Sequence, residues 1–436
     1  MSLPVIDIAG FLEPTSTPEA LQTIADKIHA ACLTTGFFYL SGHGVTAEEG
    51  AQILRSTRAF LVDGTPGEKE RLSIARNDHA RGYQRIGDNV TGGKSDWHEA
   101  LDLYAPSPFP HLPQIDQLKV LAGQNRFPDR PADFQPVVEN WIRRLSELGL
   151  VLMRATAMGL KMSLSETEQL LDQVRNSFWS IEQSLSILST FPQESLLSDL
   201  RHLQSSFFLS RSLFFRVLRC IGYPPLPSTH DGVSCGAHKD YGCFTFLHAD
   251  STKGSLQVYV PKANATHDEQ EPEYHWIEAN PIEGAFVVNI GEMWETWTNG
   301  LYKATLHRVV HKSNNYRVSV PFFYEPAFDA IVAPLPAAIR LQQRLQGKQL
   351  VEIVKKPVKY GEFLMSKVSG NFSTSADSDA QRRDRYLLFV GSVDGRVLPL
   401  YDQIHNLVPS SLGLQCIIII SVANYFQSLG TSEPHN

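Results

Sequence analysis

Short runs of β-forming residues, separated by turn-forming residues, recur through the second half of this chain and constrain its fold more than any other feature. They begin after Asp231 and occupy residues 243–247, 255–260, 275–278, 285–290, 303–311 and 316–324. Short strands between turn signals are typical of a β-sandwich or a jelly roll. We also expect a hairpin at Thr298-Asn299-Gly300-Leu301, because Asn-Gly accepts the positive φ angles of a type I′ turn.

The first half of the chain carries helical patterns instead. Apolar residues recur with helical periodicity in residues 21–33, 46–60 and 134–158. In the longest of these segments one stripe carries Val137, Trp141, Leu145, Leu148, Leu152 and Ala155. Two short strands and two loops are expected at residues 4–8, 36–40, 81–83 and 92–93. The predicted fold is α+β, with a double-stranded β-helix (jelly roll) core and surrounding N-terminal helices.

The composition is that of an ordinary globular protein and argues against several kinds of partner. The 436 residues are 42% hydrophobic and 19% charged with a net charge of −7, so no basic face for nucleic acid is indicated. The N-terminus lacks a signal-peptide pattern, and the longest apolar run, Cys416 to Ala423, is too short to cross a bilayer. Five cysteines without a Cys-x-x-Cys pair favour reduced thiols. We therefore expect a cytoplasmic protein without nucleic-acid or membrane partners, whose oligomeric state the sequence leaves open.

Three His-x-acid triplets are candidates for a metal site: His238-Lys239-Asp240, His248-Ala249-Asp250 and His267-Asp268-Glu269. On an extended segment residues i and i+2 share a face, so both side chains of such a triplet can reach one ion. The third triplet lies in a polar stretch that indicates an exposed loop, and the second ends a predicted strand. The first lies at the mouth of the β region and has the strongest context. Two histidines and one carboxylate, with open positions left over, are the ligands of non-haem iron(II) sites.

His307, in a predicted strand, is the candidate for the missing ligand. A strand histidine by itself is more often a satisfied core or surface residue. Arg317 and Ser319 change this balance, because they follow ten and twelve residues later and share one face of a predicted strand. A guanidinium beside a hydroxyl suits a buried carboxylate. The alternative, a surface salt bridge, is disfavoured by the apolar residues around Arg317.

The motifs described so far belong to a longer ordered set of segments along the chain. These are Pro4-Val5-Ile6-Asp7, Thr35-Gly36-Phe37-Phe38-Tyr39, Gly42-His43-Gly44-Val45, Asp96-Trp97-His98-Glu99, Gly236-Ala237-His238-Lys239-Asp240, Asn289-Ile290-Gly291-Glu292, Thr298-Asn299-Gly300-Leu301-Tyr302-Lys303-Ala304, His307-Arg308-Val309 and Arg317-Val318-Ser319. Taken together in order, they resemble the isopenicillin N synthase-like 2-oxoglutarate/iron(II) oxygenase family. The resemblance covers most of residues 1–175 and 217–372.

The resemblance implies a catalytic metal centre in which His238, Asp240 and His307 bind Fe(II). It also implies 2-oxoglutarate and O2 as co-substrates, with ascorbate as a further candidate cofactor. The implied reaction is oxidation of a small organic metabolite with release of succinate and CO2. Hydroxylation is the expected outcome, and desaturation and ring closure remain open. The relatives that the chain resembles are fungal and plant enzymes of small-molecule, secondary metabolism, but no motif identifies the substrate.

The resemblance further implies a 2-oxoglutarate pocket. Arg317 and Ser319 would hold the distal carboxylate, and Tyr223 would lie beside the co-substrate. The family carries an asparagine two residues before this tyrosine, and Ile221 stands there instead. Part of the family's polar network is therefore altered in this chain.

Two segments depart from the family pattern. We divide the chain into an N-terminal oxygenase region, an atypical insertion, an Fe(II)/2-oxoglutarate jelly-roll core, a C-terminal helical part and an atypical tail, at residues 1–175, 180–216, 217–330, 331–372 and 373–436. The insertion is either an extra helical excursion or translated intron sequence, and we favour the second. The tail is a further candidate gene-model artefact, or it covers the core or mediates association.

Two alternative functions stay open on the sequence. The insertion falls just before Tyr223, so one alternative is a jelly-roll binding protein whose catalysis is impaired. The other is an oxidase of the same fold that does not use 2-oxoglutarate. Product formation without succinate release would favour the oxidase. Fe(II) binding by the wild type and by His238→Ala tests the impaired binding protein, because equal binding in both would remove the predicted metal site.

Overall fold

The computed structural model describes most of the first 371 residues and two short segments beyond them. The described residues are 2–74, 81–104, 125–175, 214–228, 230, 232–262, 273–347, 350–371, 391–393 and 396–398. The chain divides into two compact units, Met1–Phe372 and Ser373–Asn436. In the second unit the structure describes one antiparallel pair, β17 (Gly391–Val393) with β18 (Arg396–Leu398). The predicted insertion up to residue 213 and most of the predicted tail lie outside the described residues.

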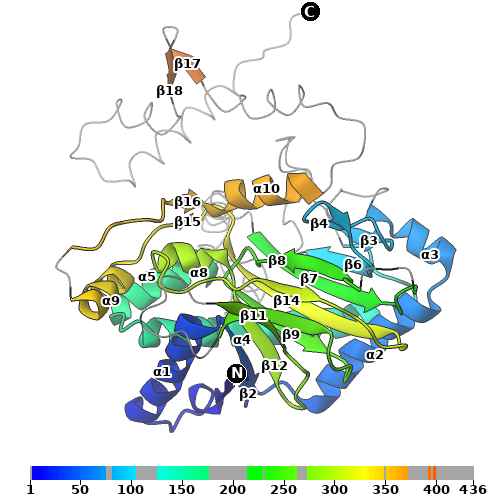
Figure 1. Ribbon diagram of the computed structural model, residues 1–436, viewed down its shortest axis with the longest axis horizontal. Helices are drawn as coiled ribbons and strands as arrows, with labels where there is room; N and C mark the ends of the chain where they lie inside the picture. Colours follow the sequence, from blue (N-terminus) through cyan, green and yellow to red (C-terminus); the bar gives the residue numbers. More distant parts are fainter. Residues whose placement is uncertain are drawn as a thin grey trace, which may run out of the picture. The chain divides into compact units, whose positions relative to one another are not determined.

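Two sheets form the centre of the first unit (Figure 1). The large sheet contains, in spatial order, β1 (Val5–Asp7), β2 (Phe37–Ser41), β12 (Phe286–Ile290), β9 (Phe244–Ala249), β14 (Arg317–Ala327), β7 (Phe214–Tyr223), β6 (Glu99–Tyr104) and β3 (Gly82–Gln84). The small sheet contains β11 (Tyr274–Glu278), β10 (Leu256–Pro261), β13 (His307–Val309) and β8 (Cys235–His238). This arrangement confirms the jelly-roll core.

The helices are α1 (Pro18–Thr34), α2 (Ala47–Asp63), α3 (Pro66–Arg71), α4 (Phe134–Gly159), α5 (Leu164–Arg175), α8 (Glu292–Trp297), α9 (Pro336–Gln346) and α10 (Tyr360–Asn371), with the 3₁₀ turn η1 (Ala9–Phe11). Threonine residues cap the N-termini of α1 and α2. The Thr17 side chain accepts a hydrogen bond from the backbone nitrogen of Ala20, and Thr46 forms a capping box with Glu49. Among the helices described, none combines the length and the apolar character that a bilayer crossing requires.

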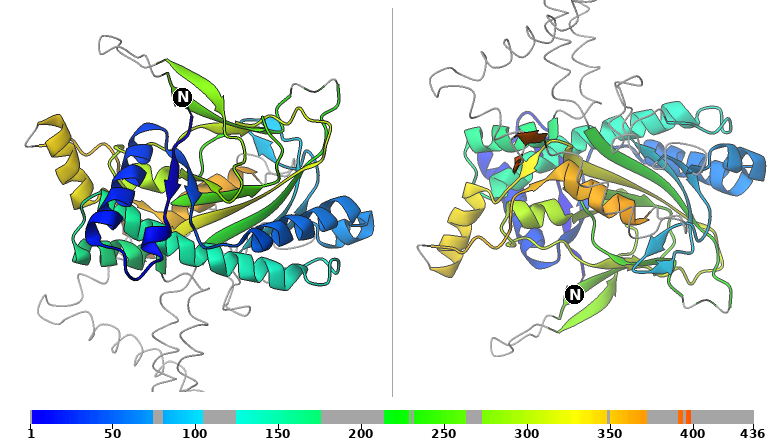
Figure 2. Two further views of the ribbon diagram at one scale, coloured as in Figure 1. Left: turned by 90° about the horizontal axis from the view of Figure 1, so that it is seen from below. Right: turned by 90° about the horizontal axis from the view of Figure 1, so that it is seen from above.

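Helices α1, α2 and α4 cover one side of the large sheet (Figure 2). The apolar stripe predicted for α4 is buried along its whole length. Gly149 lets this helix approach β14 closely, because a Cβ there would overlap the ring of Tyr324. Val320 and Phe322 of β14 belong to the same apolar core as Trp141 of α4. Side chains alternate along a strand, so Arg317 and Ser319 of β14 lie on the other, inner face, toward the small sheet.

Smaller elements complete the unit. These are the pairs β4 (Val90–Thr91) with β5 (Lys94–Ser95) and β15 (Ile331–Val332) with β16 (Val358–Lys359). A second apolar layer lies on the inner face, where Phe37 and Tyr39 of β2 pack with Val258 of β10. This layer joins the large sheet to the small sheet. Near β14 and β7 the inner face carries a separate, smaller apolar cluster that includes Ile221 and Tyr223.

Three local expectations were wrong. Gly82 and Tyr83, expected in a loop at residues 81–83, instead belong to β3 because they pair with β6. The strand expected at 303–311 is reduced to His307–Val309. Asn299 and Gly300 do have positive φ angles of 53° and 81°, but they end helix α8 and do not join two strands. The Asn299 side chain is held by the backbone nitrogens of Val354 and Lys355, a tertiary contact that no local pattern could indicate.

Candidate active site

Three of the predicted residues come together where the small sheet meets the loop after β8. The register of β13 and β8 places His307 opposite His238, and the two rings lie 4.3 Å apart. Asp240 follows two residues after β8, and its Oδ1 lies 3.6 Å from Nε2 of His238 and 3.5 Å from Nε2 of His307. These three side chains form a group whose ligand atoms all lie within 4.8 Å of one another.

Backbone carbonyls fix the tautomers of both imidazoles. Nδ1 of His238 lies 2.8 Å from the carbonyl oxygen of Gly236, and Nδ1 of His307 lies 3.1 Å from that of Thr305. A carbonyl oxygen can only accept, so each Nδ1 carries a hydrogen and each Nε2 faces Asp240. Two imidazole nitrogens and one carboxylate oxygen therefore converge on one position, as the donors of a metal site do.

The second oxygen of Asp240 is held by the large sheet. Its Oδ2 accepts a hydrogen bond from Nδ2 of Asn289 at 2.7 Å and another from the hydroxyl of Thr245. Burial raises the pKa of Asp240, but His307, His238 and Asn289 outweigh it and hold the pKa below its usual range. Sequence reasoning missed both supporting residues as part of the site. Asn289 opens one of the family-like segments, whereas Thr245 carries no local signal.

The same pocket favours positive charge on His238. Burial lowers the pKa of this imidazole, yet Cys235 and Asp240 outweigh burial and raise the pKa to about 10. Sγ of Cys235 lies 3.9 Å from Nδ1 of the ring. A pocket that stabilises a proton on His238 is electrostatically suited to a cation.

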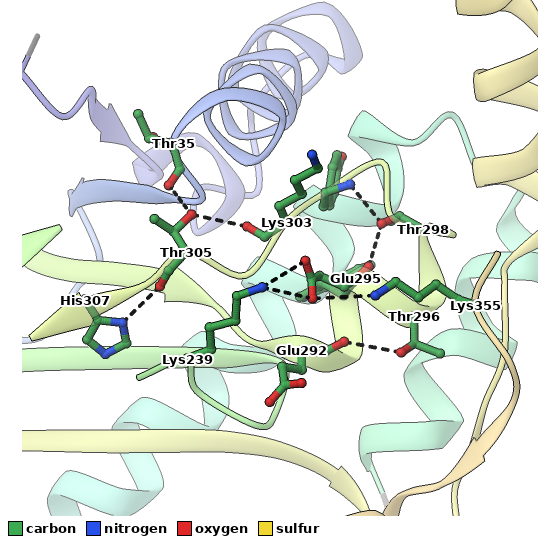
Figure 3. Close-up of polar contacts among 12 residues, drawn as sticks. Thr35, Lys239, Glu292, Glu295, Thr296, Thr298, Lys303, Thr305, His307 and Lys355 are labelled. Atoms are coloured by element: carbon green, nitrogen blue, oxygen red, sulfur yellow. Dashed lines mark hydrogen bonds and ion pairs between the residues drawn. The ribbon is translucent and has the colours of Figure 1, made fainter. Parts of the chain in front are cut away.

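A loop from the first unit's N-terminal region supports His307 (Figure 3). The hydroxyl of Thr305 donates to the carbonyl oxygen of Thr35 at 2.7 Å, and the carbonyl of Thr305 accepts from His307. Gly36 has a φ of +62°, and a Cβ there would lie 2.7 Å from the Lys303 carbonyl oxygen and from the Thr305 hydroxyl. A glycine is therefore required for this close approach.

The predicted carboxylate-binding residues also lie together, on the inner face of the large sheet. Arg317 of β14 pairs with Tyr223 of β7, and Ser319 pairs with Ile221. The Arg317 guanidinium lies over the Tyr223 ring at 4.7 Å. Burial raises the pKa of Tyr223, whereas Arg317 and a hydrogen bond with Ser319 lower it.

Arg317 is the most informative of these residues. It is only 2% exposed, and its Nε and Nη1 have no hydrogen-bond partner among the residues that the structure describes. Leaving a buried charged donor unpaired is costly in a folded protein. The guanidinium therefore presents two donors to an anionic group that the chain itself does not supply.

The triplet His248-Ala249-Asp250 does not form such a site. Nε2 of His248 is engaged with the carbonyl of Gly50 at 3.0 Å, and Asp250 pairs with Arg58 at 2.7 Å. Residues 267–269 lie outside the described residues. Among the described residues, the first triplet is the one of the three that belongs to a group of potential metal ligands.

A second group of potential ligands, Asp96, His98 and Cys235, lies close by. Both oxygens of Asp96 accept hydrogen bonds, from the Gly236 backbone and the Thr91 hydroxyl. Both nitrogens of His98 are engaged as well, by Asn89 and by the Ser234 carbonyl. Burial lowers the pKa of His98 to about 3. These side chains are already occupied, so they support β8 and do not offer an open metal site.

Polar groups also surround Lys239, which lies between His238 and Asp240 in the sequence. Nζ of Lys239 lies 3.4 Å from Oε1 of Glu295, whose Oε2 lies 3.7 Å from Nζ of Lys355 (Figure 3). Both lysines are part-exposed, while Glu295 is largely buried. These charges fix helix α8 against the loop that carries Asp240.

Comparisons with known proteins identify the family of the chain. Residues 3–130 match the family model "non-haem dioxygenase in morphine synthesis N-terminal", and residues 211–326 match "2OG-Fe(II) oxygenase superfamily". A homoarginine-6-hydroxylase of Arabidopsis thaliana is 34% identical, over 85% of this chain and 98% of the relative. A 2-oxoglutarate-dependent dioxygenase of Aspergillus niger is 30% identical, over 76% of this chain and 86% of the relative.

A solved structure supports the fold independently. A full-length protein of Neurospora crassa, solved in complex with alpha-KG and thymine, superposes with a TM-score of 0.61 at 20% identity, and the match covers 84% of this chain and 96% of that one. The chain thus belongs to the 2OG-Fe(II) oxygenase superfamily. It is an oxidoreductase that uses Fe(II) and 2-oxoglutarate to hydroxylate a small metabolite.

Proposed function

We propose that this member of the 2OG-Fe(II) oxygenase superfamily hydroxylates a basic amino acid of the homoarginine type. The proposal names the substrate class within the hydroxylase activity described above. Its support is the 34% identity to a homoarginine-6-hydroxylase over nearly the full length of that relative. Related hydroxylases from rice and soybean carry the same description at 33% and 31% identity.

His238, Asp240 and His307 are the proposed Fe(II) ligands. Two Nε2 lone pairs and one carboxylate oxygen form the two-histidine, one-carboxylate set that non-haem Fe(II) prefers and that leaves coordination positions open. The fixed Nδ1 hydrogens and the anchored Oδ2 of Asp240 hold these donors in place before any ion binds.

Arg317 carries the assignment of 2-oxoglutarate in this proposal. Its buried, unpaired Nε and Nη1 suit the distal carboxylate of that co-substrate. Ser319 shares the inner face and adds a hydroxyl, and Tyr223 lies against the guanidinium and limits its movement.

When bound, Fe(II) and 2-oxoglutarate supply the activation of O2 that oxidises an unactivated C–H bond, with release of succinate and CO2. The side chains of the protein position the metal and the co-substrate. Asp240, held by Asn289 and Thr245, keeps one oxygen directed at the metal position, and Arg317 orients the co-substrate through its charge. The buried inner face around Tyr223 excludes water from the co-substrate's distal end.

The direct experiment measures succinate release with Fe(II), 2-oxoglutarate and a panel of L-homoarginine, L-arginine, L-lysine and uncharged amino acids, and the product mass alongside it. We expect L-homoarginine to raise succinate release well above the substrate-free rate and to gain one oxygen atom. The His238→Ala variant serves as the inactive control and should also lose Fe(II) binding. No stimulation by any basic amino acid would contradict the substrate class. Equal Fe(II) binding by the variant and the wild type would contradict the metal site.

A further inference from the structure

An additional charged residue lies on the face that carries the proposed 2-oxoglutarate pocket. Side chains alternate along β7, so Arg219, Ile221 and Tyr223 share one face. The register pairs Tyr223 with Arg317 and Ile221 with Ser319, which identifies that face as the inner one. Arg219 and Tyr223 are four positions apart along β7, about 13 Å. Arg219 is therefore an inner-face cation distinct from Arg317.

A buried carboxylate holds Arg219 in place. Nε of Arg219 donates to Oδ1 of Asp102 at 2.7 Å, and Oδ2 of Asp102 accepts from Nε2 of Gln84 at 2.5 Å. The Asp102 side chain is 5% exposed, whereas the Arg219 side chain is 21% exposed. The anchoring carboxylate is thus enclosed, and the arginine is the member of the pair that faces open space.

The outer edge of this guanidinium remains unused. Within the part of the chain that the structure describes, the hydrogen bonds of Arg219 involve Nε alone. Its two terminal nitrogens point along the edge that binds carboxylates bidentately. Arg58 provides a contrast, since it contacts Asp250 through its terminal Nη2 at 2.7 Å. The contact with Asp102 therefore leaves both terminal nitrogens of Arg219 available to a carboxylate.

Arg219 also lies on the side of the metal position. Phe323 of β14 pairs with Val217 of β7, two residues before Arg219, and on its other side with Thr245 of β9. The Thr245 hydroxyl contacts Asp240. Along the inner face of β7, Arg219 therefore lies between the level of Tyr223 and the level of the proposed Fe(II) ligands.

We propose that Arg219, held by Asp102 and Gln84, binds a carboxylate of the substrate and so fixes which carbon approaches the metal. The substrate is accordingly a carboxylic acid, and for the amino acid class of the proposed function, on which this inference rests, the group is the α-carboxylate. Arg219 contacts the substrate directly. Asp102 and Gln84 are positioning residues that act through Arg219.

The test compares an acid with its neutral amide. Dissociation constants of L-homoarginine and L-homoarginine amide are measured by calorimetry without O2, on protein loaded with Fe(II) and 2-oxoglutarate. We expect the wild type to bind the acid about 10- to 100-fold more tightly, the range for a charge-assisted hydrogen-bonded pair. In Arg219→Met this preference should fall to about one, while 2-oxoglutarate affinity stays unchanged. A wild type that binds acid and amide equally would overturn the inference without any variant.

Two further variants separate recognition from folding. Arg58→Met removes the arginine of another Arg–Asp pair and should keep the acid preference of the wild type. Asp102→Asn should reduce the preference partially, since Arg219 keeps its charge but loses its anchor. If Arg219→Met fails to fold, Arg219→Lys keeps one charge without the fork and should retain only part of the preference. An unchanged preference in a folded Arg219 variant would refute the role of this residue.

Failure of the proposed function gives a different result. If basic amino acids release no succinate, the acid–amide comparison is repeated with whichever carboxylic acid of a wider metabolite panel does. A preference that depends on Arg219 then supports the inference while the amino acid assignment falls. Succinate release only with molecules that lack a carboxylate overturns the inference itself. Turnover of L-homoarginine with an acid preference independent of Arg219 leaves the proposed function standing and removes the inference.

Discussion

The Asn289 amide holds Oδ2 of Asp240 at 2.7 Å, and this contact leaves Oδ1 facing the two imidazoles. The carboxylate is thus divided between a structural oxygen and a metal-facing oxygen. Because Asn289 belongs to β12 of the large sheet while His238 and His307 belong to the small sheet, the bond also connects the two layers at the site.

Removing that bond should weaken metal binding without removing a ligand. We predict that Asn289→Ala lowers Fe(II) affinity about 10- to 100-fold, the usual effect of losing a hydrogen bond that orients a metal ligand. The measurement is anaerobic Fe(II) titration. Asn299→Ala, which alters an amide away from the ligands, is the control for general destabilisation. Asn289→Ala with wild-type Fe(II) affinity would show that Thr245 alone suffices to hold Asp240.

Replacing Arg317 should separate stability from co-substrate binding. In Arg317→Met the buried unpaired donors disappear, so we expect the Tm of the ligand-free protein to stay equal or rise. Saturating 2-oxoglutarate should raise the Tm of the wild type but not that of the variant. At a ligand concentration of 100 Kd, the stabilisation lost from the free energy of unfolding is about 2.7 kcal/mol. Iron binding should be retained.

The surface residue Arg340, paired with Glu166 at 2.9 Å, provides the matched control for this experiment. Arg340→Met should keep the full stabilisation by 2-oxoglutarate. A similar Tm gain with 2-oxoglutarate in Arg317→Met would argue that another cation holds the distal carboxylate.

Gly36 should be needed for the metal site as well as for the fold. Alanine at this position adopts a strained positive φ and meets the Lys303 carbonyl and the Thr305 hydroxyl, which together support His307. We expect Gly36→Ala to destabilise the protein by about 1–3 kcal/mol and to weaken Fe(II) binding. Gly92→Ala is matched, since Gly92 has a φ of +59° and a Cβ added there would meet nothing within 4 Å. Gly92→Ala should therefore lose stability through backbone strain but keep the Fe(II) affinity of the wild type.

Buried neutral His98 should contribute to acid sensitivity. Its folded-state pKa of about 3 lies below the unfolded value of 6.5, so the unfolded chain binds the proton first. The stabilisation is complete above pH 6.5 and is lost as pH falls toward 3, at about 1.4 kcal/mol per pH unit. Between pH 6 and pH 5, the free energy of unfolding of His98→Gln should fall less steeply with pH than that of the wild type. The expected difference in slope corresponds to the uptake of one proton. Denaturant unfolding at several pH values measures this slope, and identical slopes would contradict the assignment.

The sequence was sufficient for the elements with strong periodicity. The stripe of Val137 and Trp141 predicted α4 because a helix must bury one apolar face, and the structure buries it. The spacing within His238-Lys239-Asp240 predicted that both side chains reach one position, and they do, although Asp240 lies two residues beyond the end of β8. Local rules failed where long-range contacts decide: Asn299 has the predicted φ, yet its partners lie beyond residue 350 and the turn ends a helix.

The sequence by itself determined the chemistry that this chain can offer: two histidines, a carboxylate and an Arg-x-Ser pair on alternating strand positions. Only the tertiary structure decided how those groups are used. It set the Nδ1 partners of both histidines, left Arg317 buried with unpaired donors, and placed the Asp102-anchored fork of Arg219 on the same face. The reason is physical: side-chain type and strand alternation are local properties, whereas burial and hydrogen-bond satisfaction depend on which distant strands pair.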